Sequence, residues 1–146
     1  MPTASDFIGA WDIARTIADK SGGPDGQFAG QATFHPRPDG WLDYVETGTL
    51  TVGDGTPMRA ERRYLWRVDG QGAEVRFADG RPFHAFDWDG ARATHPCGDD
   101  TYRVRYDFSG WPEWIAAWDV TGPRKDYRMV TRHRPTLAGG PRSGDE

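Results

Sequence analysis

The chain has 146 residues, enough for one ordinary domain with a core of its own. The formal net charge is -4 and the arginines are scattered rather than run together, which argues against a nucleic-acid surface. Cys97 is the only cysteine, so no internal disulfide can form and a reducing cytoplasm fits. The first residues do not resemble a signal peptide, and no apolar run is long enough to cross a membrane. We therefore expect a cytoplasmic protein without a nucleic-acid or membrane partner.

Aromatic residues make up 13% of the chain, and 7 residues are tryptophans. Together with 19 glycines and 11 prolines, this composition is typical of many short strands joined by tight turns. Large rigid rings serve equally well in a filled core and in the wall of a binding cavity. Composition alone leaves both uses open.

In chain order, residues 5–10 (SDFIGA) fit a capped helical turn or a short lead-in to the first strand. Alternating apolar and polar residues then predict roughly nine strands separated by turn-forming residues. The clearest hairpin signal is DGQG at 69–72. The expected strands are 11–17, 27–35, 41–52, 58–68, 73–78, 80–88, 101–108, 111–122 and 125–134.

Consecutive hairpins of this kind close most simply into an antiparallel up-and-down β-barrel, because closure removes the exposed strand edges. A β-sandwich is the alternative all-β architecture. No repeat or linker divides the chain, so we expect one barrel domain over 5–135. The glycine-rich residues 136–146 are expected to form a disordered tail.

Four polar residues share a predicted strand face with large apolar neighbours: Arg15, Glu46, Arg62 and His84. A charge that faces the interior costs several kcal/mol unless it is paired and hydrogen-bonded. On the strand at 80–88, His84 lies in phase with two aromatic rings, while Phe83 falls on the opposite face. The simplest interpretation of His84 is a buried histidine that hydrogen-bonds a neighbour.

If the barrel closes, Glu46 and Arg62 on adjacent strands are expected to meet inside it, with Arg15 nearby. An excess of arginine in an aromatic cavity suits an anionic ligand, because a guanidinium binds a carboxylate or phosphate in a bidentate way. The alternative is that the same charges form a buried pair in a filled core. A β-bulge in one of these strands would also shift the alternation by one residue and place these side chains on the opposite face of the sheet. The expected ligand-binding residues are Arg15, Tyr44, Glu46, Arg62, Tyr64, Trp66 and His84.

Two further segments hold reactive residue types without a specific pattern. HPCGDD at 95–100 matches no standard zinc spacing, and its cysteine lacks a clearly oriented base. GPRKDY at 122–127 lacks the glycine-rich turn into a helix that phosphate cradles use. We therefore expect no metal and no cofactor.

The segments FIGAW, YVETGTL, RRYLWR, FADGRPFH, HPCGDDTYRVRY, WDVTGPRKDY and TRHRP, spread over nearly the whole chain, resemble a bacterial family of unknown function. The GAW at 9–11 also resembles the Gly-x-Trp start of the lipocalin-like (calycin) barrels. The resemblance implies a lipocalin-like barrel with a ligand cavity. It names no ligand and no catalytic residue.

Three functions fit these observations. The first is a barrel that binds a small anionic or aromatic molecule. The second is a small enzyme, a lyase or isomerase, in which Glu46 acts as general acid or base. The third is a filled barrel that serves as an interaction module. The sequence leaves the oligomeric state open, a homodimer included.

Overall fold

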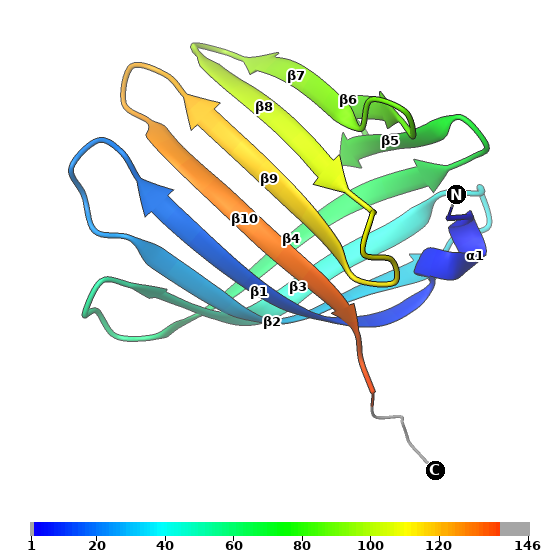
Figure 1. Ribbon diagram of the computed structural model, residues 1–146, viewed down its shortest axis with the longest axis horizontal. Helices are drawn as coiled ribbons and strands as arrows, with labels where there is room; N and C mark the ends of the chain where they lie inside the picture. The colour runs from blue at the N-terminus through cyan, green and yellow to red at the C-terminus, as the bar shows by residue number, and fades with distance from the viewer. Residues whose placement is uncertain (1, 138–146) are drawn as a thin grey trace.

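The computed structural model describes residues 2–137, and within them ten strands follow one short helix (Figure 1). The helix α1 spans Ala4–Phe7, and its preceding residue Thr3 donates its backbone N–H to the Asp6 carboxylate at 2.7 Å. The strands are β1 (Gly9–Asp19), β2 (Gly26–Pro36), β3 (Leu42–Val52), β4 (Met58–Val68), β5 (Gly72–Phe77), β6 (Pro82–Asp87), β7 (Arg92–Cys97), β8 (Asp100–Asp107), β9 (Trp114–Thr121) and β10 (Asp126–Pro135).

All the strands belong to one antiparallel sheet in the order β6-β5-β4-β3-β2-β1-β10-β9-β8-β7. The first and last long strands pair side by side, with Trp11 opposite Pro135 and Asp19 opposite Tyr127. The sheet therefore curls into an up-and-down barrel, as predicted (Figure 1). Closure is incomplete, because no backbone ladder joins β6 to β7 in the described chain.

The expected count of nine strands was one too low. The missed strand is β7, which pairs with β8 from Arg92 opposite Arg105 to Cys97 opposite Asp100. Pro96 and the lack of alternating apolar residues made this segment resemble a loop. Proline is tolerated there because β7 is an edge strand whose outer side takes part in no ladder.

One end of the barrel is filled by aromatic rings. Phe7 of α1 is fully buried, and its ring lies 5.9 Å from Trp66 and 5.7 Å from Trp114 between centroids. Trp11 fixes the helix by donating its indole N–H to the Phe7 carbonyl at 2.9 Å. The short helix thus closes this end, and Trp66 and Trp114 separate it from the interior beyond.

The seam between β6 and β7 is filled by side chains. A register shift between Val75 and Arg76 of β5 leaves Phe83 as an extra residue on β6. Phe83 and His84 are consequently both buried, so the expectation that Phe83 faces outward was wrong. The Phe83 ring stacks on Phe77 at 4.7 Å and lies 5.2 Å from His95 of β7.

At the C-terminal side of β10, Thr136 donates its backbone N–H to the carbonyl of Ala10 at 3.1 Å. Residues 138–146 of the expected tail lie outside the described residues. No helix within residues 2–137 has the length and apolar character needed to span a lipid bilayer.

Candidate functional site

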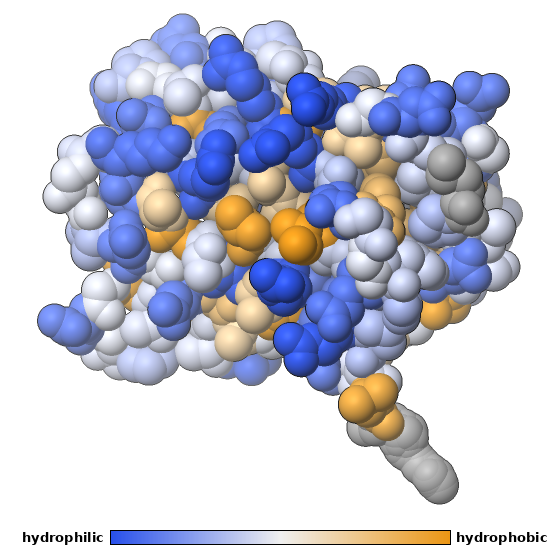
Figure 2. Space-filling model, viewed as in Figure 1, coloured by the Kyte–Doolittle hydropathy of each residue, from blue (hydrophilic) through white to orange (hydrophobic). Residues whose placement is uncertain are grey.

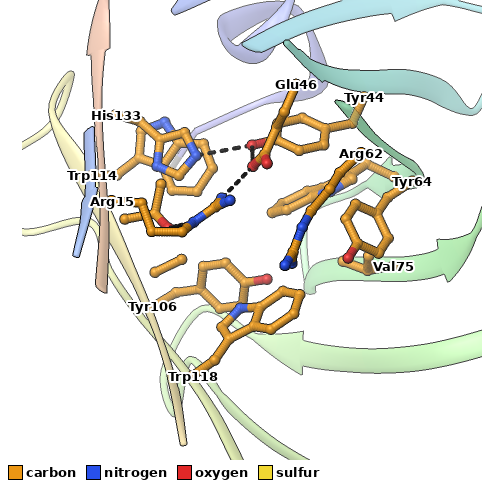
Figure 3. Close-up of a pocket in the computed structure, with 13 residues that line it drawn as sticks. Arg15, Tyr44, Glu46, Arg62, Tyr64, Val75, Tyr106, Trp114, Trp118 and His133 are labelled. Atoms are coloured by element: carbon orange, nitrogen blue, oxygen red, sulfur yellow. Dashed lines mark hydrogen bonds and ion pairs between the residues drawn. The ribbon is translucent and has the colours of Figure 1, made fainter. Parts of the chain in front are cut away.

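A small cavity of about 30 Å³ lies inside the barrel (Figure 3). Its lining includes every predicted ligand-binding residue except His84: Arg15, Tyr44, Glu46, Arg62, Tyr64 and Trp66. The alternation of β1, β3 and β4 turns these side chains inward, as the sequence pattern indicated. A cavity of this size has room for about two ordered waters, so most of the interior is filled.

Arg15 and Glu46 form the central ion pair. The Arg15 Nη2 donates to Glu46 Oε2 at 2.6 Å, and its Nε donates to the Thr131 hydroxyl at 2.7 Å. The two side chains come from β1 and β3 and must therefore cross over β2. Gly30 of β2 lies between them in register, and a Cβ there would clash with the backbone of Thr47 and Gly48 on β3.

The short Arg15–Glu46 contact keeps both groups charged. Burial raises the pKa of Glu46, but the Arg15 guanidinium and the hydrogen bonds from Arg15 and Tyr44 lower it by more, so the net pKa is below the usual value. For Arg15, burial lowers the pKa and Glu46 raises it, with a net increase. Glu46 is therefore an ionised acceptor, poorly suited to donate a proton at neutral pH.

Tyr44 links Glu46 to a histidine that the sequence analysis did not select. The Tyr44 hydroxyl donates to Glu46 Oε2 at 2.6 Å, and His133 Nε2 lies 3.1 Å from the same hydroxyl oxygen. Because the ionised carboxylate takes the only hydroxyl proton, His133 must present Nε2–H. Burial lowers the pKa of His133 to about 3, so the ring is neutral and stacks on Trp114 at 3.5 Å.

Arg62 does not form the expected ion pair with Glu46. The two residues are direct partners in the β3–β4 register, but Glu46 turns to Arg15. In the described chain no carboxylate lies within ion-pair distance of the Arg62 guanidinium, which sits 5.9 Å from the centroid of the Trp118 ring. Its charge still contributes to lowering the Glu46 pKa. Arg62 is half-buried and projects into the cavity (Figure 3).

Glu46 also keeps one free acceptor. The residue is only 3% exposed, and its Oε1 has no hydrogen-bond partner among the described residues. The cavity therefore combines an available cation, Arg62, with an available buried carboxylate oxygen. Both would be satisfied by a molecule that carries an anionic group and a hydrogen-bond donor.

His84 belongs to the seam rather than to the cavity. Its Nε2 lies 2.9 Å from the Tyr106 hydroxyl of β8, which joins the two sides of the seam by a hydrogen bond. Burial lowers the pKa of His84 to about 3, so the imidazole is neutral. His84 therefore hydrogen-bonds a protein neighbour, which was the simpler interpretation of this residue, and does not line the cavity.

Several cavity residues were missed: Tyr106, Trp114, Trp118, Thr131 and His133. A signal for His133 was present, because it alternates in phase with the apolar Met129 on β10. The alternation could not show that His133 lies beside Tyr44, because that contact depends on closure of the barrel.

The two weak motifs lie away from the cavity. Cys97 is exposed on β7. Asp100 pairs with Lys125 at 3.0 Å, which joins the HPCGDD and GPRKDY segments by a surface salt bridge. No group of three or more candidate metal ligands comes together within residues 2–137.

Solved structures show the same fold at low sequence identity. An S-type phycobiliprotein lyase, CPES, from Guillardia theta matches with a TM-score of 0.63 and 5% identity, over 92% of this chain and 91% of that one. A de novo designed fluorescence-activating β-barrel matches with a TM-score of 0.51 and 15% identity, over 93% of this chain and 100% of that one. A search of curated protein sequences gave no match. A family model matches residues 7–135, and the chain therefore belongs to the family of unknown function DUF6314.

Proposed function

We propose that this protein binds a small organic anion at the inner end of Arg62. The observation that carries the proposal is the half-buried Arg62 guanidinium, which faces the cavity without a carboxylate partner in the described chain. Arg15 is less suited to this purpose, because its charge is already paired with Glu46 and its Nε donates to Thr131. The proposed ligand places a carboxylate or phosphate on Arg62 and a hydrogen-bond donor toward Glu46 Oε1.

The cavity volume requires side chains to move when such a ligand enters. A benzene-sized molecule occupies a cavity of about 150 Å³ in a protein interior, well above the space of about 30 Å³ present here. Tyr64 and Trp118 are the half-buried members of the lining beside Arg62. Rotation of the Tyr64 side chain toward solvent would enlarge the site without disturbing the Arg15–Glu46 pair. An aromatic ligand would then stack on the Trp118 ring.

Binding is better supported than catalysis. A general acid or base works best with a pKa near the operating pH, whereas the pKa of Glu46 is lowered and its charge is held by Arg15. The known structures that share the fold include a lyase, but identities of 5% and 15% support only the fold. We therefore assign Glu46 the role of acceptor and positioning residue.

The small volume favours a second candidate, a largely filled barrel that acts as an interaction module. A titration followed by ¹⁹F NMR separates the two, with 4-fluorobenzoate as probe. Binding in the cavity predicts a saturable shift of the fluorine resonance below about 10 mM. Arg62→Met should lower the affinity for 4-fluorobenzoate by roughly 10- to 100-fold, because it removes a charge-assisted hydrogen bond to the carboxylate. Arg59→Met, on the exposed face of the same strand, is the matched control and should change affinity less than about twofold.

Two results would contradict the proposal. One is the absence of any saturable shift, which would leave the filled barrel as the better description. The other is an equal loss of probe affinity in Arg59→Met and Arg62→Met, which would place the probe on the outer surface.

A further inference from the structure

The outer surface of β7 to β10 carries an unusual group of arginines. Arg92 and Arg105 are direct cross-strand partners on β7 and β8, and both are exposed. In the same row of the sheet, Arg105 is opposite Ala117 of β9, which is opposite Val130 of β10. In the adjacent row, Ile115 of β9 is opposite Arg132 of β10. We call these six residues the arginine face: Arg92, Arg105, Ile115, Ala117, Val130 and Arg132.

These arginines lack the acidic partners that six other surface arginines have. On the side of the barrel formed by β4 and β5, Arg63 pairs with Glu61 at 2.7 Å and Arg67 pairs with Glu74 at 2.9 Å. Within residues 2–137, no carboxylate lies within 4.0 Å of Arg92, Arg105 or Arg132. Like charges that face each other across two strands are unfavourable, so the Arg92–Arg105 pair has no stabilising explanation in the barrel alone.

The nearby carboxylates are already engaged. Asp119 of β9 accepts from Arg128 Nε at 2.7 Å. Asp107 borders the face and accepts from the backbone N–H of Ser109 at 2.9 Å within its own turn. Three guanidiniums of the face therefore stand against the one carboxylate of Asp107, so this part of the surface is locally positive although the whole chain has a net charge of -4.

The centre of the face is apolar and recessed. Ile115, Ala117 and Val130 are half-buried between the longer arginine side chains. A groove of about 280 Å³ runs over Arg92, Arg105, Ile115 and Ala117, and Asp107 is the one carboxylate in its lining. Figure 2 shows this side of the molecule, with apolar side chains gathered over β9 and β10 and hydrophilic side chains around them.

We propose that the arginine face binds an acidic peptide segment of a partner protein. Its carboxylates would pair with Arg92, Arg105 and Arg132, and its aliphatic side chains would pack on Ile115, Ala117 and Val130. Arginine suits this role because the planar guanidinium binds carboxylates in a bidentate way while its stem covers apolar surface. The small area predicts a weak, transient interaction whose strength falls as salt is added.

A peptide fits this surface better than the other polyanions do. Single-stranded nucleic acid needs aromatic rings on which bases stack, and the outward residues of the face are aliphatic or arginine. An anionic membrane binds apolar side chains that protrude into it, whereas these lie below the arginine heads. Charge alone would not distinguish these three kinds of partner. The recessed apolar residues Ile115, Ala117 and Val130 are what favour a peptide.

Fluorescence anisotropy with the full chain tests the proposal. The probe is a fluorescein-labelled peptide of sequence EELEELEE, with EESEESEE as its polar counterpart. The double variant Arg105→Glu/Arg132→Glu reverses the charge at two of the three arginines of the arginine face. The matched control, Arg59→Glu/Arg124→Glu, makes the same change of net charge at exposed positions on β4 and in the β9–β10 loop. A deoxythymidine octamer and phosphatidylserine vesicles report on the other polyanions.

We expect the anisotropy of EELEELEE to saturate below about 1 mM of protein. The Arg105→Glu/Arg132→Glu variant should bind this peptide roughly tenfold more weakly or worse. The control variant should weaken it less than about threefold, and EESEESEE should bind several-fold more weakly than EELEELEE. Equal losses in the two variants, or no saturation, would overturn the proposal. So would tighter binding of the octamer or the vesicles to the same face. Arg62→Met should leave peptide binding unchanged, which separates this test from that of the cavity.

Discussion

The buried Arg15–Glu46 pair gives the sharpest test of the interior described above. We consider Arg15→Met, which keeps most of the volume and the aliphatic stem of the arginine but removes its charge. Arg15 is 6% exposed and Glu46 is 4% exposed as side chains, so the variant leaves a carboxylate buried without its cation. Removing one partner of a buried pair costs about 3–5 kcal/mol of the free energy of unfolding.

The pH dependence of this loss follows from the pKa of Glu46. In the wild type the folded-state pKa lies below the usual value of 4.5, so the stabilisation is present above pH 4.5 and is lost only as the pH falls through the lower folded pKa. In Arg15→Met, burial without the directly bonded Arg15 cation outweighs the smaller effect of Arg62 and raises the pKa of Glu46 above that of the unfolded chain. The stability deficit relative to the wild type should therefore shrink by about 1.4 kcal/mol per pH unit as the pH falls from that raised pKa toward 4.5.

Urea denaturation of both proteins between pH 7 and pH 4.5 measures the deficit. The double variant Arg15→Met/Glu46→Gln removes the uncompensated charge and should lose less stability than Arg15→Met alone. Arg63→Met, which breaks the exposed pair with Glu61, is the control and should cost less than about 1 kcal/mol. A deficit of the same size for Arg15→Met and Arg63→Met, or one independent of pH, would show that the Arg15–Glu46 pair does not stabilise the interior in this way.

Three other predictions follow from single features. His84 and His133 have pKa values of about 3 because burial favours the neutral rings, so the free energy of unfolding should fall as the pH drops below about 6.5. The slope should be about 1.4 kcal/mol per pH unit for each histidine, and a flat urea-denaturation profile between pH 6.5 and 5 would contradict it. Phe83→Ala should cost about 3–5 kcal/mol and increase binding of the dye ANS, because it removes the ring that closes the β6–β7 seam. A loss below about 1 kcal/mol would show that the seam does not depend on this ring. Ala91 has φ +49°, so Ala91→Gly should raise the melting temperature, with a gain of up to about 1 kcal/mol; an unchanged or lower melting temperature would oppose this assignment.

The sequence predicted the faces of the long strands well. In β1 and β3 the period of two placed Arg15, Tyr44 and Glu46 inward, and the structure buries all three. The type of barrel followed from the hairpin order for the same reason, since consecutive strands pair everywhere except between β6 and β7. These are local properties, and a single sequence carries them.

Contacts between strands that are not consecutive could not be predicted in this way. Arg15 reaches Glu46 across β2, and that pairing depends on the stagger of the strands. The closeness of His133 to Tyr44 requires β10 to return beside β1. The bulge at Phe83 shifts one strand by a single residue, which leaves no trace in the hydrophobic pattern.

The size of the cavity also lay beyond the sequence. The tryptophans were compatible with a wall or with a filling, and Trp66 and Trp114 turn out to fill the space between α1 and the ion pair. Side-chain volumes alone do not reveal this, because the barrel's internal width depends on strand tilt and stagger.

The proposed anion site depends on Arg62, the interior cation that has no carboxylate partner in the described chain. The most direct measurement is a crystal structure grown with 4-bromobenzoate, in which the anomalous signal of bromine locates the probe. We expect a bromine peak beside Trp118 and Tyr64, with the carboxylate on Arg62 and the Arg15–Glu46 pair intact. A carboxylate bound to Arg15 in place of Glu46, or a cavity without any bromine peak, would contradict it.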